Sequence, residues 1–417
     1  MTTSQPTAAE ASPGAASGHG PGAQEAGAAK WIAVLSLGVA SFALVTSEFV
    51  PVGFLPAIAR EFDVSAGQAG LLITVPGVAA AVTAPLAAVF SGRLDRRHIL
   101  LVLTFLFVAS NVMVAVSTSF GPVLFGRVLL GIGVGGFWTI GGSLGPRLVP
   151  GPGSVRATGI ILSGIALGTV VGVPLGTVIG ETLGWRQAFW ATAAVSLGIL
   201  AVQWRVLPSL PSRTAASFGG LRACAGYGPV AIGLVMTLLT FSGHFAAYTY
   251  VTPLVAVNPT IDAALVGLLF AIYGVGTILG NLSASTLIGA DVRPVLLAAY
   301  TGIGLAVVSL GLQPQGLAPV SACLLVWGIG YGALPVSLQT WMFRAYPQAP
   351  ESVTGLFVFT VQFSIGAGSL LGGTCLDLMG PSAPFWAGGL CALTTVPLVL
   401  LGTGALATSR PSAGRNA

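Results

Sequence analysis

Charged residues are scarce in this chain of 417 residues, of which only 6% are Asp, Glu, Lys or Arg. A soluble domain carries about a quarter, so the scarcity excludes an ordinary soluble protein. Histidine and cysteine are also few, at three and four residues, and the cysteines lack metal-type spacing. Neither a metal site, a disulfide framework nor a cofactor is therefore expected. No Gly-x-x-x-x-Gly-Lys-Ser/Thr loop is present to bind a nucleotide phosphate.

Apolar residues, by contrast, make up 54% of the chain. Runs of about 18 or more recur, each long enough to cross a hydrocarbon core of about 30 Å. The alternating ten-residue pattern of a membrane barrel is not seen. The sequence therefore predicts an all-α membrane protein with twelve spans, near 31–57, 67–90, 99–118, 121–145, 157–180, 187–207, 229–257, 264–288, 294–313, 317–342, 353–377 and 383–406.

Lys and Arg are distributed unevenly between the two sides of the membrane. With an inside N-terminus, thirteen of the sixteen lie in inward segments and two, Arg60 and Arg186, in outward loops. Basic residues are retained on the cytoplasmic side. The distribution predicts a multi-pass protein of the inner membrane with both termini in the cytoplasm. It also accounts for the net charge of +5 without a nucleic-acid partner.

The chain divides into two sets of six spans. We expect an N-terminal bundle over 30–207 and a C-terminal bundle over 229–406, joined by a cytoplasmic connector over 208–228. Residues 1–29 are rich in Ala, Gly, Ser and Pro without an apolar run, so a disordered cytoplasmic tail is expected there. A second cytoplasmic tail is expected over 407–417, and the protein is expected to be a monomer.

The two halves are related in sequence. Sliding the chain by 196 or 197 residues places Gly131, Gly133, Gly135, Arg147 and Pro150 on Gly328, Gly330, Gly332, Arg344 and Pro347. A nearly constant offset across several helices indicates an internal repeat. A repeated six-helix unit is the architecture of a two-bundle secondary transporter, whose substrate site lies between the bundles near mid-membrane.

Three stretches carry a family signature. "SGRLDRRHILL" at 91–101 is a basic inward loop, "GRVLLGIGVGGFW" at 126–138 follows an Arg with spaced glycines, and "GIALGTVVGVPLGTVIG" at 164–180 repeats glycine every four residues. With "SEFVPVGFLPAIA" and "GYGALPVSLQTWMFRAYP", they make residues 31–406 resemble the major facilitator superfamily. The likeness is closest to its twelve-helix drug/proton antiporter branch, including arabinose and sugar efflux permeases and chloramphenicol-resistance-type exporters.

The resemblance implies roles for two motifs. The loop motif would hold the cytoplasmic gate through charge pairs and a helix terminus, although this copy is one residue short and lacks the second glycine. Its residues are Gly92, Asp95, Arg96 and Arg97. The antiporter helix would seal the two bundles, although close helix packing alone also explains a glycine ridge. Its residues are Gly168, Gly172, Pro174 and Gly176.

Glu48 and Arg127 alone are charged residues well inside a predicted span, at a cost on the order of 2.5–3.5 kcal/mol each. Helical rise places Glu48 about 15 Å and Arg127 about 9 Å from the outer helix ends, so we hypothesise that they face one cavity and interact. Burial favours a neutral carboxyl and a nearby Arg an ionised one, so opening or substrate binding could switch its protonation. The resemblance also places a proton-linked carboxylate in the first helix and an Arg in the fourth. A permanent ion pair, or a Glu48 that is hydrogen-bonded into the bundle, is the alternative.

Other polar and aromatic residues are candidates for a substrate cavity. His244 occupies the repeat position of Ser47, beside the position equivalent to Glu48, and Tyr248 follows one turn later. An aromatic cavity with few charges suits a neutral or amphipathic ligand, although plain packing is the competing interpretation for each residue. The full set is Trp138, His244, Tyr248, Tyr331, Gln339 and Gln362.

These features favour a secondary active exporter that exchanges a drug, natural product or sugar-like compound for protons by alternating access. Proton-coupled uptake of a small neutral solute is the alternative. A membrane-embedded enzyme is not expected, because the histidines at 19, 98 and 244 are scattered. A sensor or scaffold would usually carry a soluble signalling domain, whereas these tails are short and featureless.

Overall fold

The computed structural model describes residues 21–90, 94–141, 144–211, 218–289 and 291–401. Over these ranges every regular element is helical and no strand occurs. Twelve helices in the same ranges are long and apolar enough to cross a membrane. Each coincides with one of the spans expected from the sequence, so the prediction of an all-α membrane protein with twelve spans is confirmed.

The elements of the first half build one bundle. They are α1 (Pro21–Phe49), η1 (Val50–Phe54), α2 (Leu55–Phe62), α3 (Ala66–Ala69), α4 (Leu71–Phe90), α5 (Arg96–Val116), α6 (Phe120–Gly141), α7 (Gly145–Leu148), η3 (Gly151–Gly153), α8 (Ser154–Leu167), the π-helical turn η4 (Gly168–Gly172), α9 (Val173–Leu183) and α10 (Trp185–Val206).

The elements of the second half build the other bundle, after a short helix α11 in the connector. They are α11 (Phe218–Ala225), α12 (Gly228–Tyr248), α13 (Val251–Ala256), η5 (Ala263–Leu265), α14 (Val266–Leu287), α15 (Arg293–Gly311), α16 (Leu317–Ala345), α17 (Pro350–Met379) and α18 (Ala383–Leu401).

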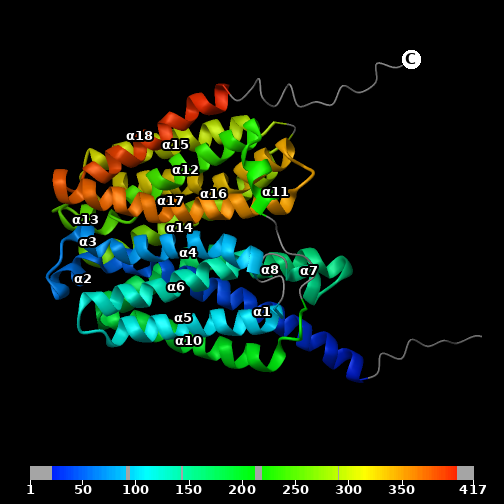
Figure 1. Cartoon of the computed structure of the whole chain (residues 1–417). Helices are drawn as coiled ribbons and strands as arrows, with labels where there is room; N and C mark the ends of the chain where they lie inside the picture. The colour runs from blue at the N-terminus through cyan, green and yellow to red at the C-terminus, as the bar shows by residue number, and fades with distance from the viewer. Residues whose placement is uncertain (1–20, 91–93, 142–143, 212–217, 290, 402–417) are drawn as a thin grey trace, which may run out of the picture.

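The two bundles lie one above the other, with α1 to α10 below and α12 to α18 above (Figure 1). We call the end at which α1 enters and α18 leaves the tail end. The opposite end, with α2, α3 and α13 at the left of Figure 1, is the distal end. Helix α1 begins at Pro21, so residues 21–29 are helical, and the apolar span within this part of the chain begins at Ala29. The remainder of the expected tails, 1–20 and 407–417, lies outside the described residues.

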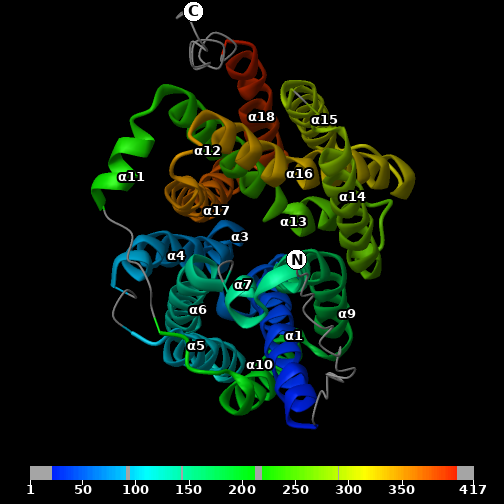
Figure 2. The same cartoon turned by 90° about the vertical axis from the view of Figure 1, so that its right-hand side faces the viewer.

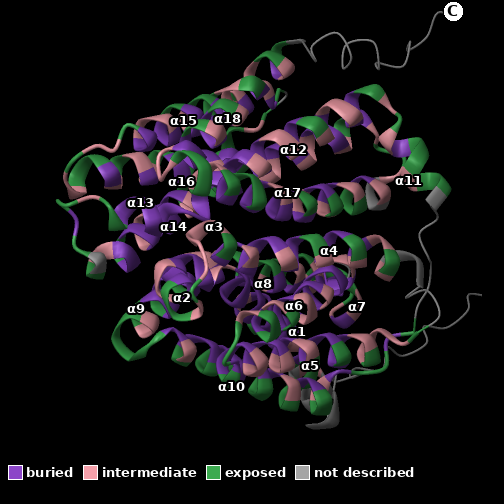
Figure 3. Ribbon diagram, turned by 60° about the vertical axis from the view of Figure 1, so that its left-hand side comes forward, coloured by how far each residue is buried: buried purple, intermediate pink, exposed green. Residues whose placement is uncertain are grey.

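Large apolar side chains are exposed on the outer faces of the bundles, unlike in a soluble protein. Buried residues line the inside of each bundle, whereas many residues on the outer faces are exposed (Figure 3). The exposed side chains include large apolar groups such as Phe105 on α5 and Trp204 on α10, which are 57% and 65% exposed. Continuous exposed apolar surface of this kind fits a lipid environment.

The first span is interrupted where the sequence places proline. Pro51 lacks the N–H that an α-helix requires, and the chain changes from α1 to the 3₁₀ turn η1 at Val50. The next span starts at a capping box, in which Ser65 and Gln68 exchange side-chain and backbone hydrogen bonds at 2.9 Å. Pro51 therefore sets the end of α1, and the Ser65 capping box sets the start of the next span.

The internal repeat of the sequence is also seen in the structure, because both halves make the same close glycine contact between two helices. A Cβ added to Gly131 of α6 would lie 2.4 Å from the carbonyl oxygen of Pro76 in α4. At the same offset in the second half, a Cβ on Gly328 of α16 would lie 2.2 Å from the carbonyl oxygen of Tyr273 in α14. Each glycine allows two helix backbones to approach closely, and both halves use it at the equivalent position.

The bundles meet along α4 with α17 and along α9 with α14, as the view from the tail end shows (Figure 2). Small residues form these contacts: a Cβ on Gly77 would lie 2.6 Å from the Gly366 nitrogen, and one on Gly274 would lie 2.8 Å from the Cα of Val170. At the distal end the Ser369 hydroxyl donates to the Gly70 carbonyl at 3.0 Å. The distal half therefore holds the bundles together.

Candidate functional site

Glu48 lies at the last turn of α1, immediately before the break at η1. Its side chain is only 2% exposed, and its Oε1 atom is buried without a hydrogen-bond partner. Buried polar atoms are nearly always hydrogen-bonded. An unpartnered carboxyl oxygen in the middle of a membrane protein is therefore a candidate for binding a proton or a ligand.

Arg127 on α6 is fully buried close to this carboxyl, but it does not form an ion pair with it. Its guanidinium donates to three backbone carbonyls, those of Leu72 at 2.7 Å and of Ser47 and Glu48 at 2.8 Å each. The two charged side chains still interact electrostatically. The structure therefore places the predicted pair together, with the arginine bound to the helix backbone instead of the carboxylate.

Gln362 on α17 faces Glu48 from the other bundle. Its side chain is 4% exposed, its amide interacts with the Glu48 carboxyl, and its Nε2 atom has no hydrogen-bond partner. Phe49 and Phe245 also meet between the bundles, stacked with ring centroids 5.4 Å apart. Two incompletely bonded polar groups and two aromatic faces thus converge where α1, α12 and α17 meet.

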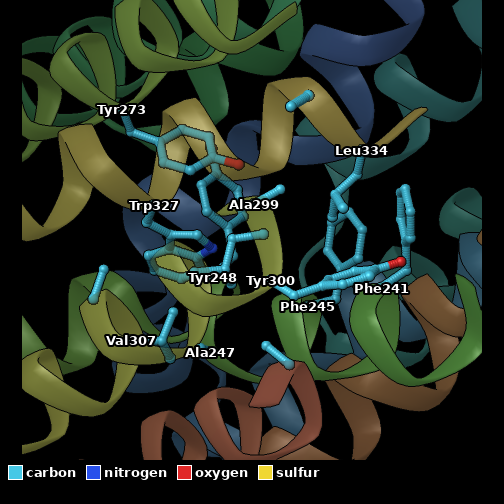
Figure 4. Packing of buried hydrophobic residues seen from close by; sticks show 14 of the residues in the cluster. Phe241, Phe245, Ala247, Tyr248, Tyr273, Ala299, Tyr300, Val307, Trp327 and Leu334 are labelled. Carbon is cyan, nitrogen blue, oxygen red and sulfur yellow. The ribbon is translucent and has the colours of Figure 1, made fainter. Parts of the chain in front are cut away.

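An aromatic cluster fills the middle of the second bundle around His244. The imidazole stacks on Tyr331 with centroids 3.8 Å apart and on Tyr248 at 5.2 Å. Tyr273 and Trp327 complete the cluster, at 6.0 and 5.2 Å from the imidazole, and Figure 4 shows Tyr248 beside these two rings. The rings bury His244 to 2% exposure.

Hydrogen bonds fix the state of the imidazole. The indole Nε1 of Trp327 donates to Nδ1 of His244 at 3.0 Å. Nδ1 therefore acts as an acceptor, and the ring proton belongs on Nε2, which lies 3.5 Å from the Tyr273 hydroxyl. The geometry suits a neutral histidine held in one tautomer, which can position a ligand but is poorly placed to carry protons.

Not all of the predicted cavity residues lie together. Trp138 stays in the first bundle, where it packs edge-on against Phe137 at 5.4 Å. Gln339 is partly exposed on α16, about two turns beyond Tyr331 towards the tail end. Tyr273 and Trp327 belong to the cluster but were not predicted from the sequence. Tyr273 occupies the repeat position of Pro76, so the repeat alignment could have drawn attention to it.

The loop motif acts within the first bundle. Asp95 caps α5 by accepting from the Arg97 nitrogen at 2.8 Å, and it also accepts from the Leu210 nitrogen at 2.8 Å and the Ser209 hydroxyl at 2.5 Å. Burial alone would raise the Asp95 pKa, but these hydrogen bonds outweigh it and hold the pKa below its ordinary value. The Arg96 nitrogen donates to the Leu210 carbonyl. Asp95 therefore fastens the segment after α10.

Gly92, the remaining residue of the loop motif, lies outside the described residues. The Arg97 guanidinium donates to the Trp204 carbonyl at 2.7 Å, again within the first bundle. This bond also anchors α5 to α10.

The glycine ridge of the antiporter motif faces α1. A Cβ on Gly168 or Gly172 would meet Val45 or Thr46, and one on Gly176 would meet Val50. The contact with the second bundle comes from the other side of the same span. There Val170 and the Pro174 carbonyl oppose glycines of α14. The glycine ridge therefore packs the helix within its own bundle, and Val170 and Pro174 contact the second bundle.

Comparisons with known proteins place this arrangement in context. The family model for the Major Facilitator Superfamily matches residues 37–259. The chain is 34% identical over 377 residues to the transcription regulatory protein OpdE of Pseudomonas aeruginosa, covering 89% of this chain and 93% of that one. It is 30% identical over 369 residues to the purine ribonucleoside efflux pump NepI of Salmonella paratyphi A, with coverage of 88% and 92%.

Solved structures share the fold. A mutant of the nucleoside transporter NupG superposes with a TM-score of 0.75 at 13% identity, covering 90% of this chain and 99% of that one. A bacterial homologue of the human lysosomal transporter Spinster, inward-facing and unoccupied, superposes with a TM-score of 0.68 at 16% identity, covering 93% and 99%.

Proposed function

The chain belongs to the major facilitator superfamily, and on that premise we propose that it exports a neutral molecule of the purine-ribonucleoside class in exchange for protons. As a membrane-embedded transporter it takes a small-molecule substrate through the lipid bilayer.

The observation that carries the proposal is the buried, unpartnered carboxyl oxygen of Glu48 opposite Gln362. A carboxyl group between two bundles changes its surroundings whenever the bundles rock. Its proton affinity changes with those surroundings, because water and neighbouring charges favour the ionised form and burial favours the neutral form. Glu48 is therefore the group through which proton movement would couple to opening and closing.

The chemistry around Glu48 fits a planar, polar-edged ligand. Phe49, Phe245 and Tyr331 supply aromatic faces near the bundle interface. The Gln362 amide and the Glu48 carboxyl supply a donor and an acceptor that no protein group fully uses. A purine presents ring faces for stacking and an edge of alternating donors and acceptors. Few charges lie nearby, which favours an uncharged nucleoside over a nucleotide.

The direction of transport is inferred from the relatives. NepI is named an efflux pump for purine ribonucleosides, and the chain aligns with most of its length. The uneven distribution of basic residues supports an inner-membrane location with the tail end in the cytoplasm. In that orientation the bundle contacts at the distal end close the outer face, as an exporter waiting for cytoplasmic substrate requires.

Proteoliposomes containing the purified protein test the proposal. With radiolabelled adenosine as the probe, wild-type protein should drive adenosine against its gradient when protons flow the opposite way. Glu48→Gln should lose this pH-driven movement and keep adenosine exchange at equal pH, because an amide cannot release a proton. Glu181→Gln, which changes an exposed carboxylate on α9, is the matched control and should behave as wild type.

Four outcomes would contradict the proposal in different ways. Movement of adenosine with protons instead of against them would identify an uptake permease. Full pH-driven transport by Glu48→Gln would remove Glu48 from the coupling. Absence of adenosine exchange by the wild-type protein, together with exchange of another solute, would refute the substrate class. Binding of adenosine without any exchange would favour a regulatory role, as the name of OpdE indicates for that protein.

A further inference from the structure

Two prolines interrupt the helices that meet Arg127. Ser47 precedes Pro51 by four residues and Leu72 precedes Pro76 by four. In an α-helix the carbonyl of residue i accepts from the N–H of residue i+4, and proline has no N–H to donate. The carbonyls of Ser47 and Leu72 each lose their usual partner in this way. Within a membrane such a carbonyl must find another donor.

Arg127 supplies that donor to both carbonyls at once. Its Nη1 donates to Ser47 and its Nε donates to Leu72, while its Nη2 reaches the adjacent carbonyl of Glu48. The Glu48 carbonyl would find Pro51 again as its partner in the 3₁₀ pattern that begins at η1. A guanidinium offers five N–H groups in a fixed fork, so one side chain can serve all three carbonyls.

The packing of α6 brings the guanidinium to this position. Gly131 lies one turn after Arg127 on the same face of α6. It lets α6 approach so closely that a Cβ there would lie 2.8 Å from the Cα of Pro76. The glycine after the arginine therefore places the fork within reach of the interrupted helix α4.

The second half of the chain serves as an internal control. At the offset of the repeat, Leu324 stands in place of Arg127, and Tyr248 and Tyr273 stand in place of the two prolines. Tyrosine has a backbone N–H, so the helix carbonyls keep their donors. The Phe245 carbonyl, equivalent to that of Glu48, accepts from the Thr249 N–H at 3.4 Å. The arginine and both prolines are thus present together in one half and absent together from the other.

We infer that Arg127 is a positioning residue that completes two proline-interrupted helices and thereby holds Glu48 at the bundle interface. Its main partners are the carbonyls freed by Pro51 and Pro76, and the Glu48 carboxylate is a secondary one. We call the three hydrogen bonds of Arg127 to these carbonyls the backbone brace, and the brace does not depend on the proposed function. Its effect on the protonation of Glu48 rests on that function.

Two rescue experiments separate a backbone brace from an ion pair. Arg127→Leu should lower the yield of monodisperse, folded protein by roughly tenfold or more, because three buried carbonyls lose their donors. Adding Pro51→Ala and Pro76→Ala returns the missing N–H groups. The yield should then come within about twofold of the double alanine parent, which carries both proline replacements and keeps Arg127. Adding Glu48→Gln to Arg127→Leu removes only an unpaired charge and should not restore it.

Further variants keep the comparison decisive. Arg127→Lys keeps the charge but lacks the fork, so it should remain impaired. If the double alanine parent folds poorly, Arg127→Leu with Pro76→Ala is compared with Pro76→Ala alone. Rescue by Glu48→Gln, or no rescue by the alanine replacements, would overturn the brace and favour an ion pair.

A readout of Glu48 itself tests the positioning role. In the rescued triple variant the helices are complete but the guanidinium is absent. The pH dependence of Glu48 modification by a hydrophobic carbodiimide should therefore be displaced from that of the alanine parent. An unchanged pH profile would limit Arg127 to folding and contradict its positioning of Glu48. This labelling needs no transported substrate, so its failure is distinguishable from failure of the proposed function.

Discussion

The carboxylate of Asp377, near the end of α17, accepts the hydroxyl of Ser65 from the other bundle at 2.6 Å. It also accepts the backbone N–H of Gly67 at 3.0 Å. Both donors lie at the start of the helical segment that leads into α4, where a helix carries partial positive charge. Asp377 thus joins the bundles at the distal end by capping a helix of the opposite half.

Removing this carboxylate should favour opening of the distal end. Asp377→Ala loses two hydrogen bonds and a charge at a helix N-terminus, worth about 1–3 kcal/mol together. The open population should rise by roughly fivefold or more. Thr252 lies on α13 at the distal end and is buried in this state, so labelling of Thr252→Cys by an impermeant maleimide should accelerate accordingly. Asp63→Asn removes an exposed charge from the same end and should have no effect; equal labelling rates in both variants would refute the latch.

The contact between α4 and α6 predicts a large effect from one methyl group. A Cβ on Gly131 would collide with the backbone of Pro76, which cannot rotate away. Gly131→Ala should destabilise the protein by about 1–3 kcal/mol, measured as thermal unfolding in detergent. Gly198→Ala, on α10 with open space around it, should be neutral or stabilising by about 0.5–1 kcal/mol. Similar behaviour of the two variants would contradict the close approach.

The indole of Trp327 is expected to hold His244 in its tautomer. Trp327→Phe removes the donor to a buried imidazole nitrogen, so the free energy of unfolding should fall by about 1–3 kcal/mol. In a double-mutant cycle with His244→Phe, the two losses should not add. Trp190→Phe, at a partly exposed indole on α10, should cost less than about 0.5 kcal/mol. Additive effects in the cycle would show that the bond contributes nothing.

The sequence was sufficient for the fold because lipid imposes strong rules. Long apolar runs could only be helices, and a constant offset between glycines revealed the repeat. The interruption of the first span followed from Pro51. The first membrane span was placed to within a few residues of its start at Ala29, whereas the helical extension back to Pro21 could not be predicted, because its Ala- and Gly-rich segment lacks apolar content.

The site was only partly predictable. Glu48 and Arg127 stood out because buried charge is rare, but their depths could not reveal that the guanidinium points to carbonyls. Side-chain direction depends on tertiary packing, here on the approach of α6 to α4. Three members of the aromatic cluster, His244, Tyr248 and Tyr331, were named from the sequence. Tyr273 and Trp327 were not, because they come from other parts of the chain and join His244 only in three dimensions.

Glycine contacts between the bundles, such as that of Gly77 with Gly366, have a consequence for motion. Glycine has no rotamers to reorder, so a surface built from it has the same shape whether it is joined or separated. Ordering a long side chain costs up to about 2 kcal/mol of conformational entropy, and these contacts avoid that cost. The bundles can therefore part and rejoin as rigid bodies with little entropy change, leaving polar groups such as Asp377 to set which state prevails.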